Sequence, residues 1–484
     1  MLKRRDFLRG AAAGIGAIGA GIAPTILARA ADAPRRPNVL FIMTDQQHWR
    51  MMSCAGNPYL KTPAMDGLAA AGTRFDLAYA AFPLCIPARV AMVTGRMPSR
   101  SGITDNIGQV PEAFLGGVKR DETLGAVFQR AGYETAYGGK VHLPRGLGPI
   151  DQIGFQYISK DERDGLADAC VEFLGRKHDK PFLLVASFIN PHDICYMAID
   201  AFAKASGSPQ AFPQSNRERT CLAEALHLPE GVSREEFFRK LCPPVPDNYA
   251  IPAGEPACAV AERAFRAYVR QNWTDEDWRL HRWAYCRLTE RVDAEIARVL
   301  AALRQGGLEE NTVVVFTSDH GDMDASHRLE HKSVLYEEAA HVPFIISAKG
   351  ATRGGAVDRT HLVSAHLDLI PTLCDYAGIA PPAGLPGRSI RPLIEGRAPP
   401  AWRDAVAAEV PRGRMIRTAR FKYNRFSTGE EQLFDMEKDP GEMTDLARRP
   451  DQQAVLDDHR RRLAAWCTET GDTFLSSSPA PAKA

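Results

Sequence analysis

The stretch around which this chain is organised covers residues 83–96 and reads Pro83-Leu84-Cys85-Ile86-Pro87-Ala88-Arg89-Val90-Ala91-Met92-Val93-Thr94-Gly95-Arg96. Pro87 suits the start of a helix, because the first helical N–H groups have no intrahelical partner, and Gly95 suits its end. Cys85 would then lie at a helix N-terminus, where free N–H groups and the helix dipole favour negative charge. Arg89 follows one turn later on the same side. A buried structural cysteine beside a surface arginine explains this stretch equally well, so other parts of the chain must decide.

The bulk composition allows a normal globular core and excludes some partners. The chain has 484 residues, of which 45% are hydrophobic and 25% charged, which is enough for one large or two ordinary domains. A net charge of +1 indicates neither nucleic acid nor an acidic membrane surface as a partner. The ten cysteines include no Cys-x-x-Cys pair, which argues against a zinc ribbon or a redox motif.

Residues 1–30 have the pattern of an export signal. A basic start with Arg4 and Arg5 precedes an apolar run over 11–27 and a small-x-small site at 28–30. The apolar run is short for a membrane span, so we expect no stable membrane insertion; a retained N-terminal anchor is the alternative. The paired arginines resemble a twin-arginine signal, which predicts export through the Tat machinery to the periplasm or the exterior of a bacterium.

Apolar runs alternate with helical patterns along the chain. The expected strands cover residues 37–44, 133–137, 181–189, 312–317 and 342–347, and the expected helices cover 123–131, 166–177, 276–304 and 453–468. Continuous apolar runs are typical of strands that are buried on both faces. The sequence therefore predicts an α/β fold: a large domain with a mostly parallel mixed sheet sandwiched by helices, and a smaller C-terminal α+β subdomain with a short antiparallel sheet.

The predicted domains are a signal peptide over 1–30, a large catalytic domain over 36–378 and a C-terminal subdomain over 379–484. Within the large domain, residues 195–260 contain many prolines and little periodicity. We interpret them as an insertion of loops and short helices, and such loops usually carry specificity.

Two expected strands end in an acidic residue that a second polar residue follows, namely Asp45-Gln46 and Asp319-His320. In open α/β sheets, ligands bind at the carboxyl ends of the strands. Two carboxylates at one sheet edge repel each other unless positive charge lies between them, and a divalent cation supplies it. Each aspartate alone is better explained as a helix cap, but the pair with its Gln and His neighbours favours a metal site.

Lysines and histidines also follow the expected strands. These residues are Lys140, His142, His192, His327, His331 and Lys332. Each of them alone is more often a structural or solvent-exposed residue. Because all of them follow apolar strands, we expect them to meet at one rim of the sheet, and such a rim suits a tetrahedral oxyanion.

The pattern Cys85-x-Pro-x-Arg89 with Thr94-Gly95-Arg96 downstream resembles the signature of the type I sulfatases of the alkaline phosphatase superfamily. Further motifs occur in the order of that family, at residues 38–45, 138–142, 190–192, 318–322, 332–343 and 435–446. The resemblance covers nearly all of residues 36–450 and is weakest in 195–260. It implies hydrolysis of small-molecule or oligosaccharide sulfate esters, with carbohydrates as the leading class.

By this resemblance, a separate formylglycine-generating enzyme would oxidise Cys85 to formylglycine. The aldehyde hydrates to a geminal diol, one oxygen of the diol attacks sulfur, and the ester alcohol leaves. The second hydroxyl is then deprotonated and expels sulfate, which regenerates the aldehyde. A thiol has no second hydroxyl and cannot perform this last step.

The resemblance also implies a metal site. Asp45, Gln46, Asp319 and His320 would bind one divalent metal ion together with an oxygen of residue 85. Many sulfatases have a second Asp in place of Gln46 and an Asn in place of His320. Calcium is the family default, but imidazole suits Mn²⁺ better than Ca²⁺, so the sequence leaves Ca²⁺, Mn²⁺ and Mg²⁺ open.

The remaining candidate residues receive catalytic roles from the same resemblance. Arg89 would hold the diol oxygens and neutralise charge, and Lys140 would bridge the nucleophile and the sulfate. His142 would accept a proton from the diol. His192 and Lys332 would bind the leaving oxygen, with His192 as the general acid.

Two alternatives stay open at this point. The Asp-Gln and Asp-His pairs also resemble the phosphonate monoester and phosphodiester hydrolases of the same superfamily, which likewise use formylglycine. A non-catalytic binding protein that kept the fold is the other alternative, and it predicts that residue 85 remains cysteine. The complete set of candidate catalytic residues argues against it.

Overall fold

The computed structural model describes residues 36–106, 118–207, 216–260, 263–397 and 401–479. The predicted signal peptide over 1–30 lies outside these residues and stays a prediction. Residues 36–484 group into one compact unit. Among the described helices, none combines the length and the apolar character that a membrane crossing needs.

The central element is an eight-stranded sheet. Its strands are β1 (Asn38–Asp45), β2 (Thr73–Phe75), β4 (Glu134–Gly139), β5 (Gln156–Ser159), β6 (Phe182–Pro191), β7 (Thr312–Ser318), β8 (Phe344–Ala348) and β9 (Ala356–Asp358). Their order is β5-β4-β6-β1-β7-β8-β2-β9. β1 lies at the centre and pairs in parallel with β6 and β7, whereas β8 runs antiparallel to β7 and β2. The predicted mixed, mostly parallel sheet is confirmed.

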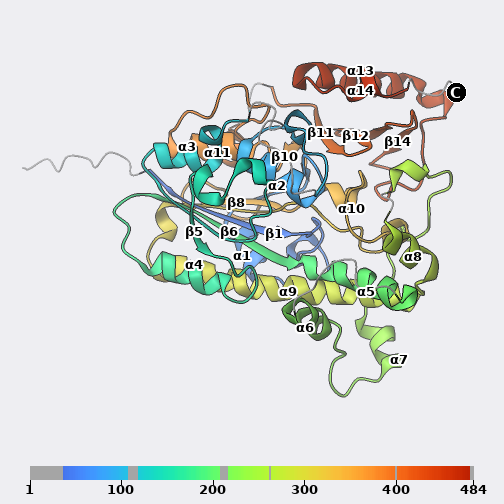
Figure 1. The fold of residues 1–484 in the computed structure, drawn as a ribbon, viewed down its shortest axis with the longest axis horizontal. Helices are drawn as coiled ribbons and strands as arrows, with labels where there is room; N and C mark the ends of the chain where they lie inside the picture. Colours follow the sequence, from blue (N-terminus) through green and yellow to red (C-terminus); the bar gives the residue numbers. More distant parts are fainter. Residues whose placement is uncertain (1–35, 107–117, 208–215, 261–262, 398–400, 480–484) are drawn as a thin grey trace, which may run out of the picture. The chain divides into compact units, whose positions relative to one another are not determined.

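Helices cover both faces of the sheet (Figure 1). One side carries α2 (Cys85–Thr94), α3 (Leu124–Arg130) and α11 (Leu369–Ala377), and the other carries α1 (Pro63–Ala71), α4 (Leu166–Gly175) and α9 (Asp275–Gln305). Val39 and Phe41 of β1 face the first group of helices, and Leu40 and Ile42 face the second. Because both faces of β1 are covered, its sequence is continuously apolar rather than alternating.

After β6 the chain forms α5 (Cys195–Ser206), α6 (Asn216–Ala225), α7 (Arg234–Glu236) and α8 (Ala264–Asn272), and the short α10 (Glu337–Ala340) follows β7. Residues of α5, α6 and α8 line one cavity. α5 and α8 pack against each other through Ile199, Phe265 and Val269. A two-stranded parallel sheet of β3 (Ala78–Tyr79) and β10 (Val363–Ser364) lies beside the main sheet in the fold.

The C-terminal part contains the predicted short antiparallel sheet. It consists of β11 (Ala405–Val410), β12 (Gly413–Thr418), β13 (Phe421–Phe426) and β14 (Glu431–Asp435), and the nearby helices are α12 (Arg391–Ile394), α13 (Gln453–Thr470) and α14 (Phe474–Ser477). α13 packs across the sheet, with Leu456 and Leu463 against Ile416 and Tyr423 (Figure 1). β11 carries three alanines, which lack the β-branched character typical of strands.

α2 begins two residues earlier than the expected start at Pro87. Its first residue is Cys85, so Pro87 lies in the first turn, where its missing N–H costs no helical hydrogen bond. The side chain of Asn106 accepts a hydrogen bond of 3.0 Å from the N–H of Ile86. Gly95 ends the helix with a left-handed φ of 67°, as expected from the sequence.

Candidate active site

The two strand-terminal aspartates lie side by side at the carboxyl edge of the sheet. β1 and β7 are parallel neighbours, and Thr44 pairs in register with Ser318. Asp45 directly follows Thr44, Asp319 directly follows Ser318, and both aspartates are completely buried. The parallel register therefore brings together two carboxylates that are more than two hundred residues apart in the sequence.

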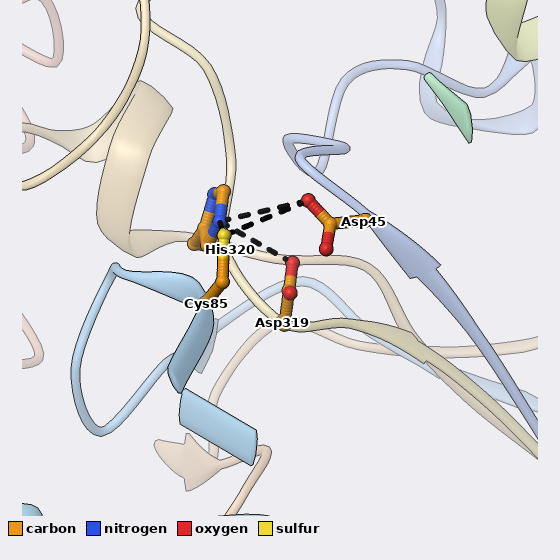
Figure 2. Close-up of side chains that lie close together, drawn as sticks. All are labelled: Asp45, Cys85, Asp319 and His320. Atoms are coloured by element: carbon orange, nitrogen blue, oxygen red, sulfur yellow. Dashed lines mark hydrogen bonds and ion pairs between the residues drawn. The ribbon is translucent and has the colours of Figure 1, made fainter. Parts of the chain in front are cut away.

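Cys85 and His320 complete a cluster with these aspartates (Figure 2). One potential ligand atom from each of Asp45, Cys85, Asp319 and His320 lies within 4.8 Å of the others. The Nε2 atom of His320 is 3.2 Å from Cys85 Sγ, 3.5 Å from Asp319 Oδ1 and 3.8 Å from Asp45 Oδ1. Four groups from three separate segments thus converge on one point.

The chemistry of these atoms fits a divalent cation. His320 Nδ1 lies 2.9 Å from the carbonyl oxygen of Gly321, which only accepts hydrogen bonds, so Nδ1 carries the proton. In the neutral ring, the Nε2 lone pair then faces the cluster, as a metal-binding imidazole requires. Two carboxylate oxygens and one imidazole nitrogen form a mixed oxygen and nitrogen ligand set.

Gln46 follows Asp45 in a left-handed conformation, with a φ of 68°. Its side-chain oxygen accepts a hydrogen bond of 2.6 Å from Lys332 Nζ, and its side-chain nitrogen donates one of 2.7 Å to Asp322 Oδ2. A glutamate in place of Gln46 would present a second carboxylate to Asp322, and the two would repel each other. Asp322 therefore explains why this position carries an amide.

Arg89 neutralises the two aspartates from the side opposite to the cluster. Its guanidinium donates to Asp45 Oδ2 at 2.8 Å and to Asp319 Oδ2 at 3.1 Å, which leaves the two Oδ1 atoms facing the cluster. It also donates to the carbonyl oxygen of Lys140 at 2.7 Å and to Ser187 Oγ at 2.9 Å. Residue 85 is not among these partners of Arg89. The contact between Arg89 and the oxygens of a modified residue 85 therefore stays a prediction.

A glycine permits the close approach that positions Lys140. A Cβ atom on Gly139, which has a φ of 87°, would lie 2.1 Å from the carbonyl oxygen of Ser187. Without it, the N–H of Lys140 donates to that same oxygen at 2.9 Å. Lys140 Nζ then reaches Asp45 Oδ2 at 2.6 Å. Burial lowers the pKa of Lys140, but Asp45 and Cys85 outweigh burial and raise it above its ordinary value.

A cavity of about 750 Å³ opens over the cluster. Its lining includes five of the six predicted catalytic residues, namely Cys85, Lys140, His142, His192 and Lys332. The sixth, Arg89, is buried below it. Burial raises the pKa of the Cys85 thiol, but Lys140, Lys332 and His320 hold it well below its ordinary value. The base of the cavity therefore favours a negatively charged group at position 85.

The two histidines on the cavity wall favour their neutral forms. Burial, together with the positive charges of Lys332 and Lys140, lowers the pKa of His192 to about 3. Burial also lowers the pKa of His142, although a hydrogen bond with Cys85 opposes this effect. His192 Nε2 lies 4.0 Å from Asp45 Oδ1. Both neutral rings therefore lie beside the cluster, and each can accept a proton.

Sequence reasoning missed several residues that shape the site. Ser187 and Asp322 fix the side chains of Arg89 and Gln46. Asp322 belongs to the motif at residues 318–322, and Ser187 lies on the predicted strand before His192. The sequence position of both residues therefore indicated that they lie near the site. Nothing in the pattern pointed to Arg266, which lies on the cavity wall.

Comparison with known proteins gives the family. The family model described as Sulfatase matches residues 37–146 and 149–379, and that of the N-sulphoglucosamine sulphohydrolase C-terminal region matches 325–469. A Delta 4,5-hexuronate-2-O-sulfatase from Bacteroides thetaiotaomicron is 31% identical, over 92% of both chains. A solved 2-O GAG sulfatase is 28% identical with a TM-score of 0.75, covering 92% of this chain and 95% of the other.

The phosphonate monoester hydrolase of Agrobacterium radiobacter shares the fold, with a TM-score of 0.67 and coverage of 93% of this chain and 100% of the other. At 22% identity, this similarity extends to the fold alone. The predicted family, fold and enzyme class are confirmed by the family models and by the hexuronate sulfatase. The chain belongs to the sulfatase family and is a hydrolase of sulfate esters.

Proposed function

We propose that this protein hydrolyses sulfate esters of carbohydrates through a formylglycine made from Cys85. The observation that carries the proposal is the convergence of Cys85 with Asp45, Asp319 and His320 at the base of the cavity. A structural cysteine needs no carboxylate or imidazole partner, and Cys85 lies close to both. The hydrated aldehyde would supply the attacking oxygen and would release sulfate by returning to the aldehyde.

Asp45, Asp319, His320 and residue 85 would hold one divalent cation, with Gln46 beside them. The cation would add positive charge next to the sulfate and lower the pKa of an adjacent hydroxyl. Arg89 keeps the two carboxylates ionised and directs their Oδ1 atoms toward the cluster. Calcium is the family default, and the imidazole of His320 favours Mn²⁺ as the alternative.

The residues on the cavity wall would divide the proton transfers between them. Neutral His142, which hydrogen-bonds residue 85, would accept the proton that leaves the second hydroxyl. His192 is neutral in the free protein, and the negative charge of a bound sulfate would raise its pKa so that it delivers a proton to the leaving alcohol. Lys140 and Lys332 would stabilise the charge of the sulfate oxygens.

Two relatives support carbohydrates as the substrate class. The hexuronate sulfatase is similar over 92% of this chain, and the 2-O GAG sulfatase shares its fold at 28% identity. The cavity volume of about 750 Å³ is in the range of sites that hold a small molecule such as one or two sugar rings.

Gln46 and His320 favour one competing function, a phosphonate monoester or phosphodiester hydrolase. The deciding experiment compares an aryl sulfate with an aryl phosphodiester on enzyme that is produced together with a formylglycine-generating enzyme. We expect a larger kcat/KM for the sulfate. A far larger kcat/KM for the diester would overturn the proposal and support the competing function.

We also propose that the protein is exported through the twin-arginine route. Support comes from Arg4, Arg5 and the apolar run that follows them. Cell fractionation should recover the mature protein in the periplasm or the medium. Replacing both arginines by lysine should retain the precursor in the cytosol, and unchanged export would contradict the route.

A further inference from the structure

The wall of the active-site cavity formed by α8 contains a buried arginine. Phe265 and Arg266 lie in the first turn of α8 and line the cavity together with Cys195 and Ile199 of α5. The Arg266 side chain is only 10% exposed. Because α8 packs on α5 through apolar side chains, Arg266 is held in a fixed wall of the cavity rather than on a loop.

Arg266 lacks the partners that a buried guanidinium needs. Within the described part of the chain, it makes no hydrogen bond, and its buried Nε has no acceptor. The buried carboxylate of Glu330 lies 3.9 Å from Nε, which makes an ion pair but is beyond hydrogen-bonding distance. By contrast, Arg163 on the same cavity wall binds both carboxylate oxygens of Asp193, at 2.7 and 3.0 Å.

A buried guanidinium without a hydrogen-bond acceptor is costly, so its presence in a cavity wall calls for an explanation. Burial and the nearby charge of Arg263 lower the pKa of Arg266 to about 10. Arg263 lies one turn earlier on the cavity rim, where it is half exposed and 3.8 Å from Asp105. Each of these two arginines therefore has a carboxylate only at 3.8–3.9 Å, too far for a hydrogen bond.

Arg266 lies on the side of the cavity that would hold the leaving alcohol rather than the sulfate. The ring of His331 packs against Phe265 at 5.1 Å, and His331, Lys332 and His192 line the same cavity as Arg266. Arg266 thus lies on the side of the cavity where His192 and Lys332 would bind the leaving oxygen. A group that reaches Arg266 must belong to the alcohol part of the ester.

We propose that Arg266 binds a second anionic group on the sugar that carries the sulfate ester, either a carboxylate or a second sulfate. The inference rests on the proposed function and adds a substrate class to it, namely sulfated uronic acids or multiply sulfated sugars. A planar guanidinium matches both anions, because its N–H groups form paired bonds to two oxygens. The substrate anion would thereby supply the acceptor that Arg266 lacks in the protein.

The test uses nitrophenyl glycosides that share one ring sulfate ester and differ only at carbon six, which carries a carboxylate, a sulfate or a hydroxyl. The proteins are full-length enzyme produced with a formylglycine-generating enzyme, and its Arg266→Met, Arg266→Lys and Arg270→Met variants. Arg270 is the matched control, because it lies one turn later on α8 but already has Glu255 and the carbonyl of His327 as partners. Nitrophenyl sulfate reports the basal activity.

We expect wild-type enzyme to prefer one of the anionic glycosides over the neutral one. Arg266→Met should lower kcat/KM on that glycoside by about 30- to 100-fold, mainly through KM, and change the neutral glycoside by less than about threefold. Arg266→Lys keeps the charge but loses the paired bonds, and should lose about tenfold. Arg270→Met should lower thermal stability and affect all glycosides alike. A carboxylate preference identifies uronic acids, and a preference for the disulfate identifies multiply sulfated sugars.

Equal loss on anionic and neutral glycosides in Arg266→Met, or no anionic preference in the wild type, would overturn the inference. If Arg266→Met does not fold, an unchanged preference in Arg266→Lys would overturn it as well. Turnover of nitrophenyl sulfate but of no glycoside would also count against it. If the wild type cleaves aryl phosphodiesters and no sulfate ester, the proposed function fails instead.

Discussion

The base of the active site and the contact between α10 and the C-terminal sheet both bury clusters of opposite charges. The second, here named the junction cluster, consists of Tyr79, Glu337, Arg417, Lys422 and Glu442. Lys422 Nζ lies 3.1 Å from Glu337 Oε1 and 2.8 Å from Glu442 Oε1. Tyr79 donates to Glu337 Oε2 at 3.0 Å and accepts from Arg417 Nε at 3.0 Å.

The two clusters perturb their carboxyl groups in the same way. At the active site, Lys140, His192 and Arg89 hold the pKa of Asp45 well below its ordinary range against the effect of burial, and burial raises the pKa of Asp319 to about 6. In the junction cluster, Lys422 holds the pKa of Glu337 low against burial, and burial raises the pKa of Glu442 to about 8.

The two clusters differ in the direction in which their polar side-chain atoms point. The junction residues contact one another and do not line the active-site cavity. Each active-site aspartate directs its Oδ1 atom to a common point that Cys85 and His320 also face, and Asp319 Oδ1 also accepts a hydrogen bond from the N–H of Gln46. A perturbed pKa therefore does not distinguish catalysis from structure here, whereas convergence below a cavity does.

The largest effect should come from Cys85→Ala. We expect kcat/KM on sulfate esters to fall on the order of 10⁵-fold, because the variant cannot form the nucleophile. The melting temperature should change little, since only a thiol is removed.

Cys374→Ala is the control for this change. Cys374 is buried in α11 within the core on one face of the sheet, away from the active-site cavity, and its variant should keep full activity. If Cys85→Ala instead unfolds the protein, Cys85 is a structural residue. The claim that the active-site cluster is catalytic and the junction cluster structural would then be wrong.

Removal of divalent metal should have the next largest effect. A chelator should lower kcat by about 10³-fold or more, because the cation stabilises charge at the sulfate. His320→Asn replaces an imidazole by an oxygen ligand and should shift the metal that best restores activity from Mn²⁺ toward Ca²⁺. Titration of the chelated enzyme with each metal measures the shift. Full activity in chelator would exclude a metal site at this position.

Paired substitutions in the two clusters test the comparison directly. Arg89→Met and Lys422→Met each remove a cation that two buried carboxylates share, so each should lower the free energy of unfolding by about 3–5 kcal/mol. Only Arg89→Met should also lower kcat/KM per folded molecule. Denaturant unfolding and active-site titration measure the two quantities. A catalytic defect in folded Lys422→Met protein would contradict the assignment of the junction cluster to structure.

The smallest effect concerns Glu409 on β11, which accepts hydrogen bonds from the N–H and Oγ of Ser99. Burial raises the pKa of Glu409 to about 7 from 4.5. The folded state therefore binds the proton more tightly than the unfolded state, and the resulting stability is present below pH 4.5 and lost as pH rises through about 7.

Glu409→Gln removes this titration from the folded state. We expect the loss of unfolding free energy between pH 5 and pH 8 to shrink on the order of 2 kcal/mol. Denaturant melts across that range measure the change. An unaltered pH dependence would mean that Glu409 is ionised in the fold.

The sequence predicted the strands and the polar residues that directly follow them. Continuous apolar runs predicted β1 and β7, and their acidic ends predicted that Asp45 and Asp319 would meet. The helix around Cys85 was likewise expected, apart from its start, which precedes Pro87 by two residues.

The sequence was uninformative about side-chain contacts that do not follow from the ends of the predicted strands. Gln46 is an amide because Asp322 faces it, and no local pattern contains that contact. The junction cluster joins residues from Tyr79 to Glu442, and Arg266 is unusual only because its buried Nε lacks a hydrogen-bond acceptor. Such features depend on tertiary packing rather than on propensity or periodicity.

The central claim is that residue 85 acts as formylglycine, and mass spectrometry tests it most directly. Trypsin releases residues 75–89 as one peptide from enzyme produced with a formylglycine-generating enzyme. We predict that an aldehyde replaces the CH₂SH group of Cys85 and that specific activity rises in proportion to the modified fraction. A peptide that retains cysteine in fully active enzyme would contradict the claim.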